Sequence, residues 1–192
     1  MHVISCIEEI ENYFDILKKA IDNISRQDIE TFTARLKRAQ EKNLAVYIMG
    51  NGGSAAAASH FCSDYNKSLR RNYTKSRMIC LNDNIPSITS YANDIDYDSI
   101  FYSQLENILN PEDIVIAVSV SGNSKNIIKA AEYADSIGAE TISLTGFDGG
   151  LLKKISKYNV NSNIDDMQIS EDIHLSILHA VSKILSRTQE LI

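Results

Sequence analysis

Four ionisable side chains have a spacing that could build a metal site or a proton-transfer site. His60 and Asp64 lie four residues apart in a segment with a helical pattern, so their side chains stand on one face about one turn apart. Glu171 and His179 lie eight apart in the last helical segment and occupy nearly one stripe. If these two helices meet, the four groups could hold Zn²⁺, Mn²⁺ or Fe²⁺.

The same groups could also do acid/base chemistry without a permanent metal. Aldose–ketose interconversion needs a base that moves a proton between adjacent carbons, and an acid or a metal that polarises the carbonyl oxygen. A structural interpretation remains open, because a histidine taken singly is often a semi-buried, hydrogen-bonded residue. We expect His174, between Glu171 and His179, to have such a supporting role.

Two loops between an apolar run and a helical pattern have the composition of anion sites. The first is Gly50-Asn51-Gly52-Gly53-Ser54, whose glycines let a ligand approach the backbone and whose free N–H groups begin a helix. The second, residues 119–124, has three serines around one glycine. A tight turn needs glycine whatever it binds, and one serine could simply cap the helix. Three serines are better explained by a bound phosphate.

Two further polar segments are open to both kinds of interpretation. Residues 145–150 are either a flexible turn or a polar wall for sugar hydroxyls. Asn93 and Asp94 end a predicted helix, where Asp94 could hold sugar hydroxyls or the pair could be a solvated helix end.

The elements that must position these residues indicate an α/β protein with three αβα layers. Continuous apolar runs separated by helical patterns are typical of a doubly wound, five-stranded parallel sheet. Residues 1–43 show helical periodicity, which predicts two N-terminal helices that break near Ser25. The predicted strands are Ala45–Met49, Met78–Leu81, Ile114–Val118, Thr141–Leu144 and Tyr158–Val160.

Composition narrows the function classes. The length of 192 residues fits one domain, 1–192, with helices for oligomerisation in 1–43 and a binding core in 44–192. A net charge of −6 argues against nucleic-acid partners, and no apolar run approaches the about 18 residues of a membrane span. We expect a cytoplasmic protein with no membrane partner, whose Cys6, Cys62 and Cys80 are reduced packing residues.

Taken together, these stretches resemble the sugar isomerase (SIS) family and, within it, the phosphoheptose isomerases. The resemblance runs through nearly the whole chain and implies the flavodoxin-like SIS fold. It also implies a homotetramer with active sites between subunits, built with the help of the N-terminal helices. The implied reaction is the metal-assisted conversion of sedoheptulose 7-phosphate to D-glycero-D-manno-heptose 7-phosphate. The motifs that carry the resemblance are residues 50–54, His60-Phe61, Asn93-Asp94, residues 119–124, residues 144–146 with 148–150, and His174 with His179.

Carried over by position, the resemblance implies roles for named residues. Asp64 and His179 would be catalytic, and His60, Asp64, Glu171 and His179 would hold a divalent metal, expected to be Zn²⁺. The serines of the two loops would bind phosphate, and Asn51 and Asp94 the sugar. The substrate-binding residues expected in full are Asn51, Gly52, Gly53, Ser54, Asn93, Asp94, Ser119, Val120, Ser121, Ser124 and Glu171.

Two positions depart from the family pattern. Asp64 stands where the family usually has a longer glutamate, and Glu171 stands where it usually has glutamine. Both replacements can still coordinate a metal, so we expect the four residues to form a site of altered geometry rather than to have lost the site. The alternatives are an isomerase of another phosphosugar and a non-catalytic SIS module that binds a phosphosugar or a protein. Bound metal would favour an enzyme over the module.

Overall fold

The computed structural model describes residues 5–69 and 76–187 and confirms the predicted α/β class. Five strands form one sheet in the order β2-β1-β3-β4-β5, and every neighbouring pair is parallel, with Ile48 of β1 beside Ile116 of β3. The strands are β1 (Ala45–Gly50), β2 (Arg77–Cys80), β3 (Ile114–Ser119), β4 (Glu140–Thr145) and β5 (Tyr158–Asn161).

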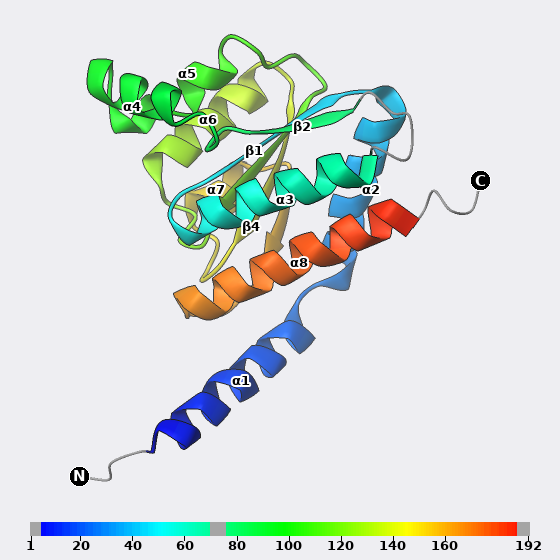
Figure 1. The fold of residues 1–192 in the computed structure, drawn as a ribbon, viewed down its shortest axis with the longest axis vertical. Helices are drawn as coiled ribbons and strands as arrows, with labels where there is room; N and C mark the ends of the chain where they lie inside the picture. Colours follow the sequence, from blue (N-terminus) through cyan, green and yellow to red (C-terminus); the bar gives the residue numbers. More distant parts are fainter. Residues whose placement is uncertain (1–4, 70–75, 188–192) are drawn as a thin grey trace.

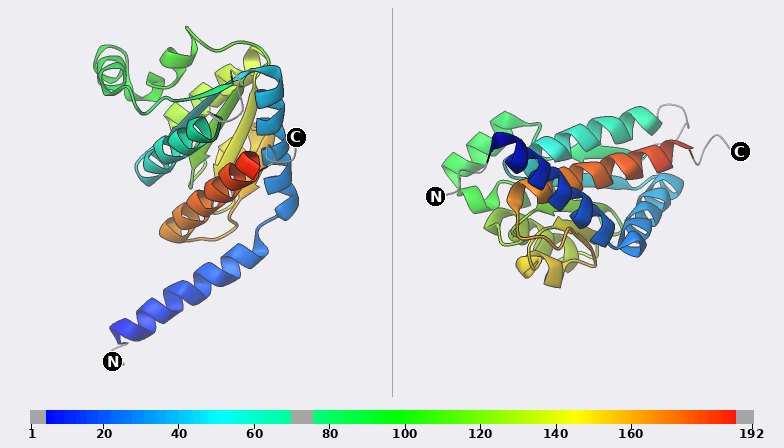
Figure 2. Two further views of the ribbon diagram at one scale, coloured as in Figure 1. Left: turned by 45° about the vertical axis from the view of Figure 1, so that its right-hand side comes forward. Right: turned by 90° about the horizontal axis from the view of Figure 1, so that it is seen from below.

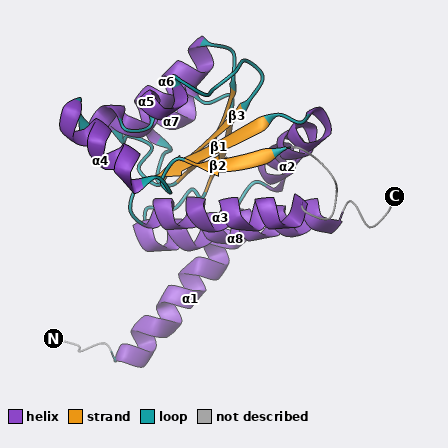
Figure 3. Cartoon of the chain, turned by 45° about the horizontal axis from the view of Figure 1, so that its top comes forward, coloured by secondary structure: helices purple, strands orange, loops and turns teal. Residues whose placement is uncertain are grey.

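Helices cover both faces of the sheet, which gives the three expected layers (Figures 1 and 3). Every residue of β1, β3 and β4 is buried, as continuous apolar runs predict for strands with two covered faces. The helices are α1 (Cys6–Asn23), α2 (Arg26–Lys42), α3 (Gly53–Leu69), α4 (Ile85–Asp94), the 3₁₀ turn η1 (Tyr97–Ser99), α5 (Tyr102–Leu105), α6 (Lys125–Ser136), α7 (Gly150–Ile155) and α8 (Met167–Arg187).

Alternate residues of each strand belong to two separate cores. Val46 and Ile48 pack with Phe61 of α3 and Ile173 of α8 on one face. Ala45, Tyr47 and Met49 pack with the helices α5, α6 and α7 on the other face. Because α3 and α8 share one core, they lie side by side on the same face of the sheet (Figure 3). This pairing is the condition that the metal-site hypothesis needed.

The break between the two N-terminal helices falls at the predicted position. The hydroxyl of Ser25 accepts a hydrogen bond from the backbone N–H of Asp28 at 3.2 Å and caps α2. A second cap was not predicted: Ser5 and Glu8 form a reciprocal capping box at the start of α1.

Helix α1 projects from the body of the protein, which it meets only along part of its length (Figures 1 and 2). The hydroxyl of Tyr13 in α1 donates a 2.6 Å hydrogen bond to Asp172 in the first turns of α8. Ala20, near the end of α1, is buried. Ile7, Ile10 and Phe14 are each at least half exposed, so an apolar stripe of α1 is open in the monomer.

The free thiols occupy two kinds of environment. Cys62 and Cys80 are buried, as expected of packing residues, and burial raises the pKa of the Cys80 thiol to about 12. The same expectation is wrong for Cys6, which is exposed because it opens the projecting helix α1. Within residues 5–69 and 76–187, no helix combines the length and the apolarity that crossing a membrane requires.

Candidate active site

The two Ser/Gly-rich loops meet at the carboxyl edge of the sheet. Strand β1 lies between β2 and β3, so the chain leaves β1 toward one side and β3 toward the other. At such a reversal of strand order the adjacent loops diverge, which leaves a crevice between them. The crevice holds a pocket of about 280 Å³. Its lining among the described residues is Asn51, Gly52, Gly53, Ser54, Val118, Ser119, Val120, Ser121, Ser124, Met167 and Glu171.

We call this crevice the loop pocket. Its lining includes every residue of the two loops that we expected to bind substrate, together with the expected Glu171 and the unpredicted Met167 from the first turns of α8. Two helix N-termini border it, because α3 begins at Gly53 and α6 begins after Ser124. Their unpaired N–H groups and helix dipoles favour an anion.

Helix capping does not account for the serine hydroxyls of the second loop. Ser124 is the N-cap of α6, yet its side chain makes no capping hydrogen bond within the described chain. Among the described residues, the one hydrogen bond that the Ser121 hydroxyl accepts is long, 3.3 Å from the backbone N–H of Asn123. The hydroxyl of Ser124 therefore remains able to serve a ligand, and the capping explanation does not account for it.

The third loop, residues 145–150, lies behind the second loop as a support. Gly122 has a left-handed backbone (φ 61°), and a Cβ there would collide with the carbonyl oxygen of Gly149. Leu152 N–H donates to the carbonyl of Gly122 at 2.9 Å, and Leu151 N–H donates to Asn123 Oδ1 at 3.0 Å. None of the described residues that line the loop pocket comes from this third loop.

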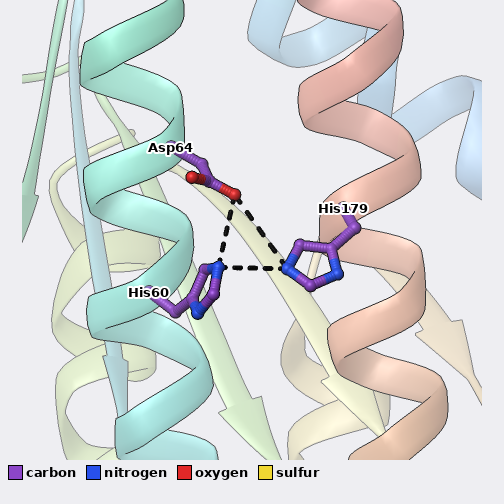
Figure 4. A group of neighbouring side chains, drawn as sticks. All are labelled: His60, Asp64 and His179. Carbon is purple, nitrogen blue, oxygen red and sulfur yellow. Dashed lines mark hydrogen bonds and ion pairs between the residues drawn. The ribbon is translucent and has the colours of Figure 1, made fainter.

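Further along the same two helices, three ionisable side chains converge (Figure 4). His60 Nε2 lies 3.1 Å from His179 Nε2 and 3.4 Å from Asp64 Oδ2, and His179 Nε2 lies 4.0 Å from the same oxygen. The side chains are roughly one-third to one-half exposed. We call these residues the ionisable triad.

The ionisable triad fits a divalent metal ion. Its three ligand atoms lie on a circle of about 2.1 Å radius, close to the length of a zinc–nitrogen or zinc–oxygen bond. Two imidazoles and one carboxylate are also a common ligand set of catalytic zinc, which keeps a fourth position for water or substrate. The partial exposure of the three groups leaves room for such a position.

Glu171 does not join the triad in this structure. It lines the loop pocket, and a Cβ added to Gly53 would collide with its carboxylate. The rise of an α-helix places Glu171 about 12 Å along α8 from His179, which separates the two despite their shared stripe. Its role as a metal ligand thus stays a prediction, whereas the structure places it beside the two loops that we expected to bind phosphate.

Asn93 and Asp94 lie at the exposed end of α4, where the amide of Asn93 donates to Asp94 at 2.8 Å. Neither belongs to the described lining of the loop pocket. Two residues that the sequence did not single out are bonded to Asn51, which lines the pocket. Tyr97 and the buried Asn126 both bond to the amide of Asn51. The signal for Asn126 was its place two residues after Ser124, the last serine of the second loop.

His174 is structural, as expected. It is almost fully buried, and its Nε2 lies 3.0 Å from the carbonyl oxygen of Thr145 at the end of β4. Burial lowers the pKa of His174 to about 4, against the opposing effect of that hydrogen bond. The imidazole is therefore neutral at physiological pH and ties α8 to the edge of the sheet.

Comparison with known proteins agrees with this geometry. The SIS domain family model matches residues 10–146. A probable phosphoheptose isomerase of Thermoplasma acidophilum is 32% identical over 90% of this chain and 95% of that protein, and a phosphoheptose isomerase of Helicobacter pylori is 32% identical over 90% of each. A phosphoheptose isomerase structure from Francisella tularensis superposes with a TM-score of 0.89 at 25% identity, covering 96% of this chain and all of that one.

The family match covers both loops of the loop pocket, and the relatives extend over nearly the whole chain. The five-stranded parallel sheet with two preceding helices is shared with the Francisella structure. The protein therefore belongs to the SIS domain family and, within it, to the phosphoheptose isomerases.

Proposed function

We propose that this protein isomerises a phosphorylated ketose to its aldose, with sedoheptulose 7-phosphate as substrate and D-glycero-D-manno-heptose 7-phosphate as product. The observation that carries the proposal is the pairing, on the same two helices, of the loop pocket with the ionisable triad. His60 lies six residues beyond Ser54, or about 9 Å along α3. A sugar several carbons long could have its phosphate in the loops and its reacting carbons near the triad.

In this proposal the loop pocket binds the phosphate without a cationic side chain. Ser54, Ser119, Ser121 and Ser124 would donate hydroxyl hydrogen bonds, and the N-termini of α3 and α6 would donate backbone N–H groups. Such fixed donors orient the sugar chain toward the triad, and orientation itself lowers the barrier of the chemical step.

His60, Asp64 and His179 would hold the divalent metal, which supplies a Lewis acid that polarises the substrate carbonyl. Both contacts of Asp64 in the triad use Oδ2, so Oδ1 remains to take a proton from the carbon next to the carbonyl. His179 contacts the triad through Nε2 and keeps Nδ1 as a second proton-transfer atom.

The proton balance of the reaction closes within these groups. Removal of the proton from the carbon gives an enediol as the carbonyl oxygen takes up a proton. Return of a proton to the neighbouring carbon, with loss of the hydroxyl proton from the first, completes the aldose. Asp64 and His179 are our candidates for the two proton carriers.

We also propose that a second copy of the chain covers the open face formed by α1, α2 and α8. A groove of about 670 Å³ lies there, lined by apolar side chains that include Ile21, Ile29 and Ile177. The exposed stripe of α1 carries Ile7, Ile10 and Phe14 nearby. Burial of such patches drives association, and we propose the homotetramer of the resemblance, in a cytoplasmic protein, as the outcome.

The test is the metal content of the purified full-length protein together with a sedoheptulose 7-phosphate isomerisation assay on the wild type and on His179→Ala. Stoichiometric metal with turnover that is lost in the variant would support the proposal. Metal without turnover would favour an isomerase of another phosphosugar. This is the second candidate function, because Asp64 and Glu171 differ from the residues usual in the family. The absence of both metal and turnover would contradict the catalytic role.

A further inference from the structure

We propose that Asn126 and Tyr97 are positioning residues that hold the side-chain amide of Asn51 in one orientation, so that it offers the substrate a hydrogen-bond donor and no acceptor. This inference rests on the proposed function, because it concerns how the loop pocket recognises a phosphosugar by hydrogen bonding. Neither residue is part of the described lining of the pocket, so both act through Asn51.

Asn51 and Asn126 form a reciprocal amide pair between the first loop and α6. Asn51 Nδ2 donates to Asn126 Oδ1 at 2.9 Å, and Asn126 Nδ2 donates to Asn51 Oδ1 at 3.0 Å. Asn126 is 2% exposed, so its amide lies in the interior rather than in the pocket. Asn51 is only partly buried and contributes to the pocket wall.

A backbone N–H fixes the orientation of the Asn126 amide, and the Asn126 amide in turn fixes that of Asn51. The N–H of Ile127 donates to Asn126 Oδ1 at 3.0 Å, and a backbone N–H can only donate. The oxygen end of the Asn126 amide is therefore set, and its nitrogen end must face Asn51. Two amide nitrogens cannot bond to each other, so Asn51 must turn its oxygen toward Asn126 Nδ2.

Tyr97 completes the arrangement from a third segment of the chain. Its hydroxyl donates to Asn51 Oδ1 at 3.1 Å. With Asn126 Nδ2 this gives Asn51 Oδ1 two donors, which occupy both of its lone pairs. Of the two Nδ2 protons of Asn51, one is bonded to Asn126 and the other remains. That N–H is what Asn51 can offer to the loop pocket.

The consequence is a defined polarity for one contact of the substrate. Asn51 would bond an oxygen that accepts, such as a phosphate, carbonyl or hydroxyl oxygen, and would disfavour a group that must donate. Because Tyr97 belongs to η1, directly after the helix that carries Asp94, the same contact also ties that segment to the first loop.

A double-mutant cycle measured by KM and kcat with sedoheptulose 7-phosphate tests the inference. We expect Asn126→Leu to raise KM about tenfold, as loss of one oriented hydrogen bond would, and Tyr97→Phe about threefold, with kcat changed less. In an Asn51→Ala background both substitutions should change KM less than twofold. A merely structural role would give the same effects in both backgrounds, and that result would overturn the inference.

Asn159→Leu is the control for the loss of a hydrogen-bonded amide outside the Asn51 network. Asn159 donates to Ser143 and Thr145 between β4 and β5 and bonds to no residue of the Asn51 network. We expect it to lower stability while leaving KM within twofold. A tenfold rise of KM in this control would mean that loss of any such amide disturbs the pocket, and would contradict a specific role of Asn126.

A measurement without substrate separates this inference from the proposed function. In NMR spectra the two side-chain amide protons of Asn51, assigned by their loss in Asn51→Ala, should exchange with solvent at different rates. Asn126→Leu should make the two rates alike. Equal rates in the wild type would overturn the fixed orientation, whatever the substrate is. Unequal rates in a protein without sedoheptulose 7-phosphate turnover would support the orientation and contradict the proposed function instead.

Discussion

The loop pocket and the ionisable triad lie on the same pair of helices but are built in opposite ways. The loop pocket takes most of its lining from two continuous stretches of sequence and depends on backbone N–H groups and hydroxyls. The triad takes its members from positions 60, 64 and 179 and depends on charged and titratable side chains. The difference teaches that residues adjacent in sequence can form the loops of a pocket, whereas the triad forms only when two helices pack in the right register.

The two regions should also fail differently when they are altered. If the loops bind phosphate as proposed, loss of one loop hydroxyl should weaken binding without abolishing it, because the neighbouring donors would remain. Loss of a triad member should stop the chemistry and leave binding nearly intact. The following predictions test that contrast, from the largest expected effect to the smallest.

The largest effect is expected at the triad. His179→Ala should lower kcat for sedoheptulose 7-phosphate about 10³-fold with KM changed little, because general acid–base groups contribute about 10²–10⁴-fold. Steady-state kinetics would check it, with the exposed Lys183→Ala on the same helix as control. A variant that keeps kcat but loses affinity would place His179 among the binding groups and remove the contrast.

The buried histidine of α8 should affect stability rather than turnover. The folded-state pKa of His174 is about 4, below its ordinary value of 6.5. Above pH 6.5 both states are neutral, but as the pH falls from 6.5 to 4 the unfolded chain gains a proton that the folded chain excludes. The free energy of unfolding should therefore fall by on the order of 3 kcal/mol across this window.

Urea unfolding at pH 7.5 and 4.5 would measure this loss in the wild type and in His174→Gln. The variant lacks the group and should lose less stability on acidification, while the other titrating groups are common to both proteins. Equal losses in the two proteins would show that His174 does not exclude the proton.

A single hydroxyl of the loop pocket should have a moderate effect. Ser124→Ala should raise KM about tenfold with a smaller change in kcat, since a hydrogen bond to a charged group is worth about 1.5–3 kcal/mol and water replaces part of it. Because the Ser124 side chain does not cap α6, the free energy of unfolding should stay unchanged. A clear loss of stability would restore the capping explanation.

The smallest effect is expected where the loop pocket carries a charge of its own. Glu171 places a carboxylate in the same pocket as the four serines, and it would repel a phosphate. Glu171→Gln should tighten the binding of inorganic phosphate about fivefold at low salt and less at high salt. Calorimetric titration at two salt concentrations would show it, and weaker binding would mean that Glu171 helps to bind the anion, for instance through a cation.

Much of the fold could be predicted because its signals are local. The five apolar runs matched the five strands to within one or two residues, since fully buried strands are continuous in hydrophobicity. Ser25 marked the break between α1 and α2 because its hydroxyl serves a backbone N–H only three residues away. The short helices α5 and α7 were not predicted, because four to six residues are too few to show a helical period.

The sequence by itself determined the class of fold, the two serine and glycine loops, and the one-turn spacing of His60 and Asp64. Tertiary structure decided that His179 completes the triad whereas Glu171 enters the loop pocket, because the register between α3 and α8 sets which side chains meet. It also decided the partners of Asn51, which lie 46 and 75 residues away. Spacing fixes geometry within one helix, but contact between distant segments depends on how the sheet and its helices pack.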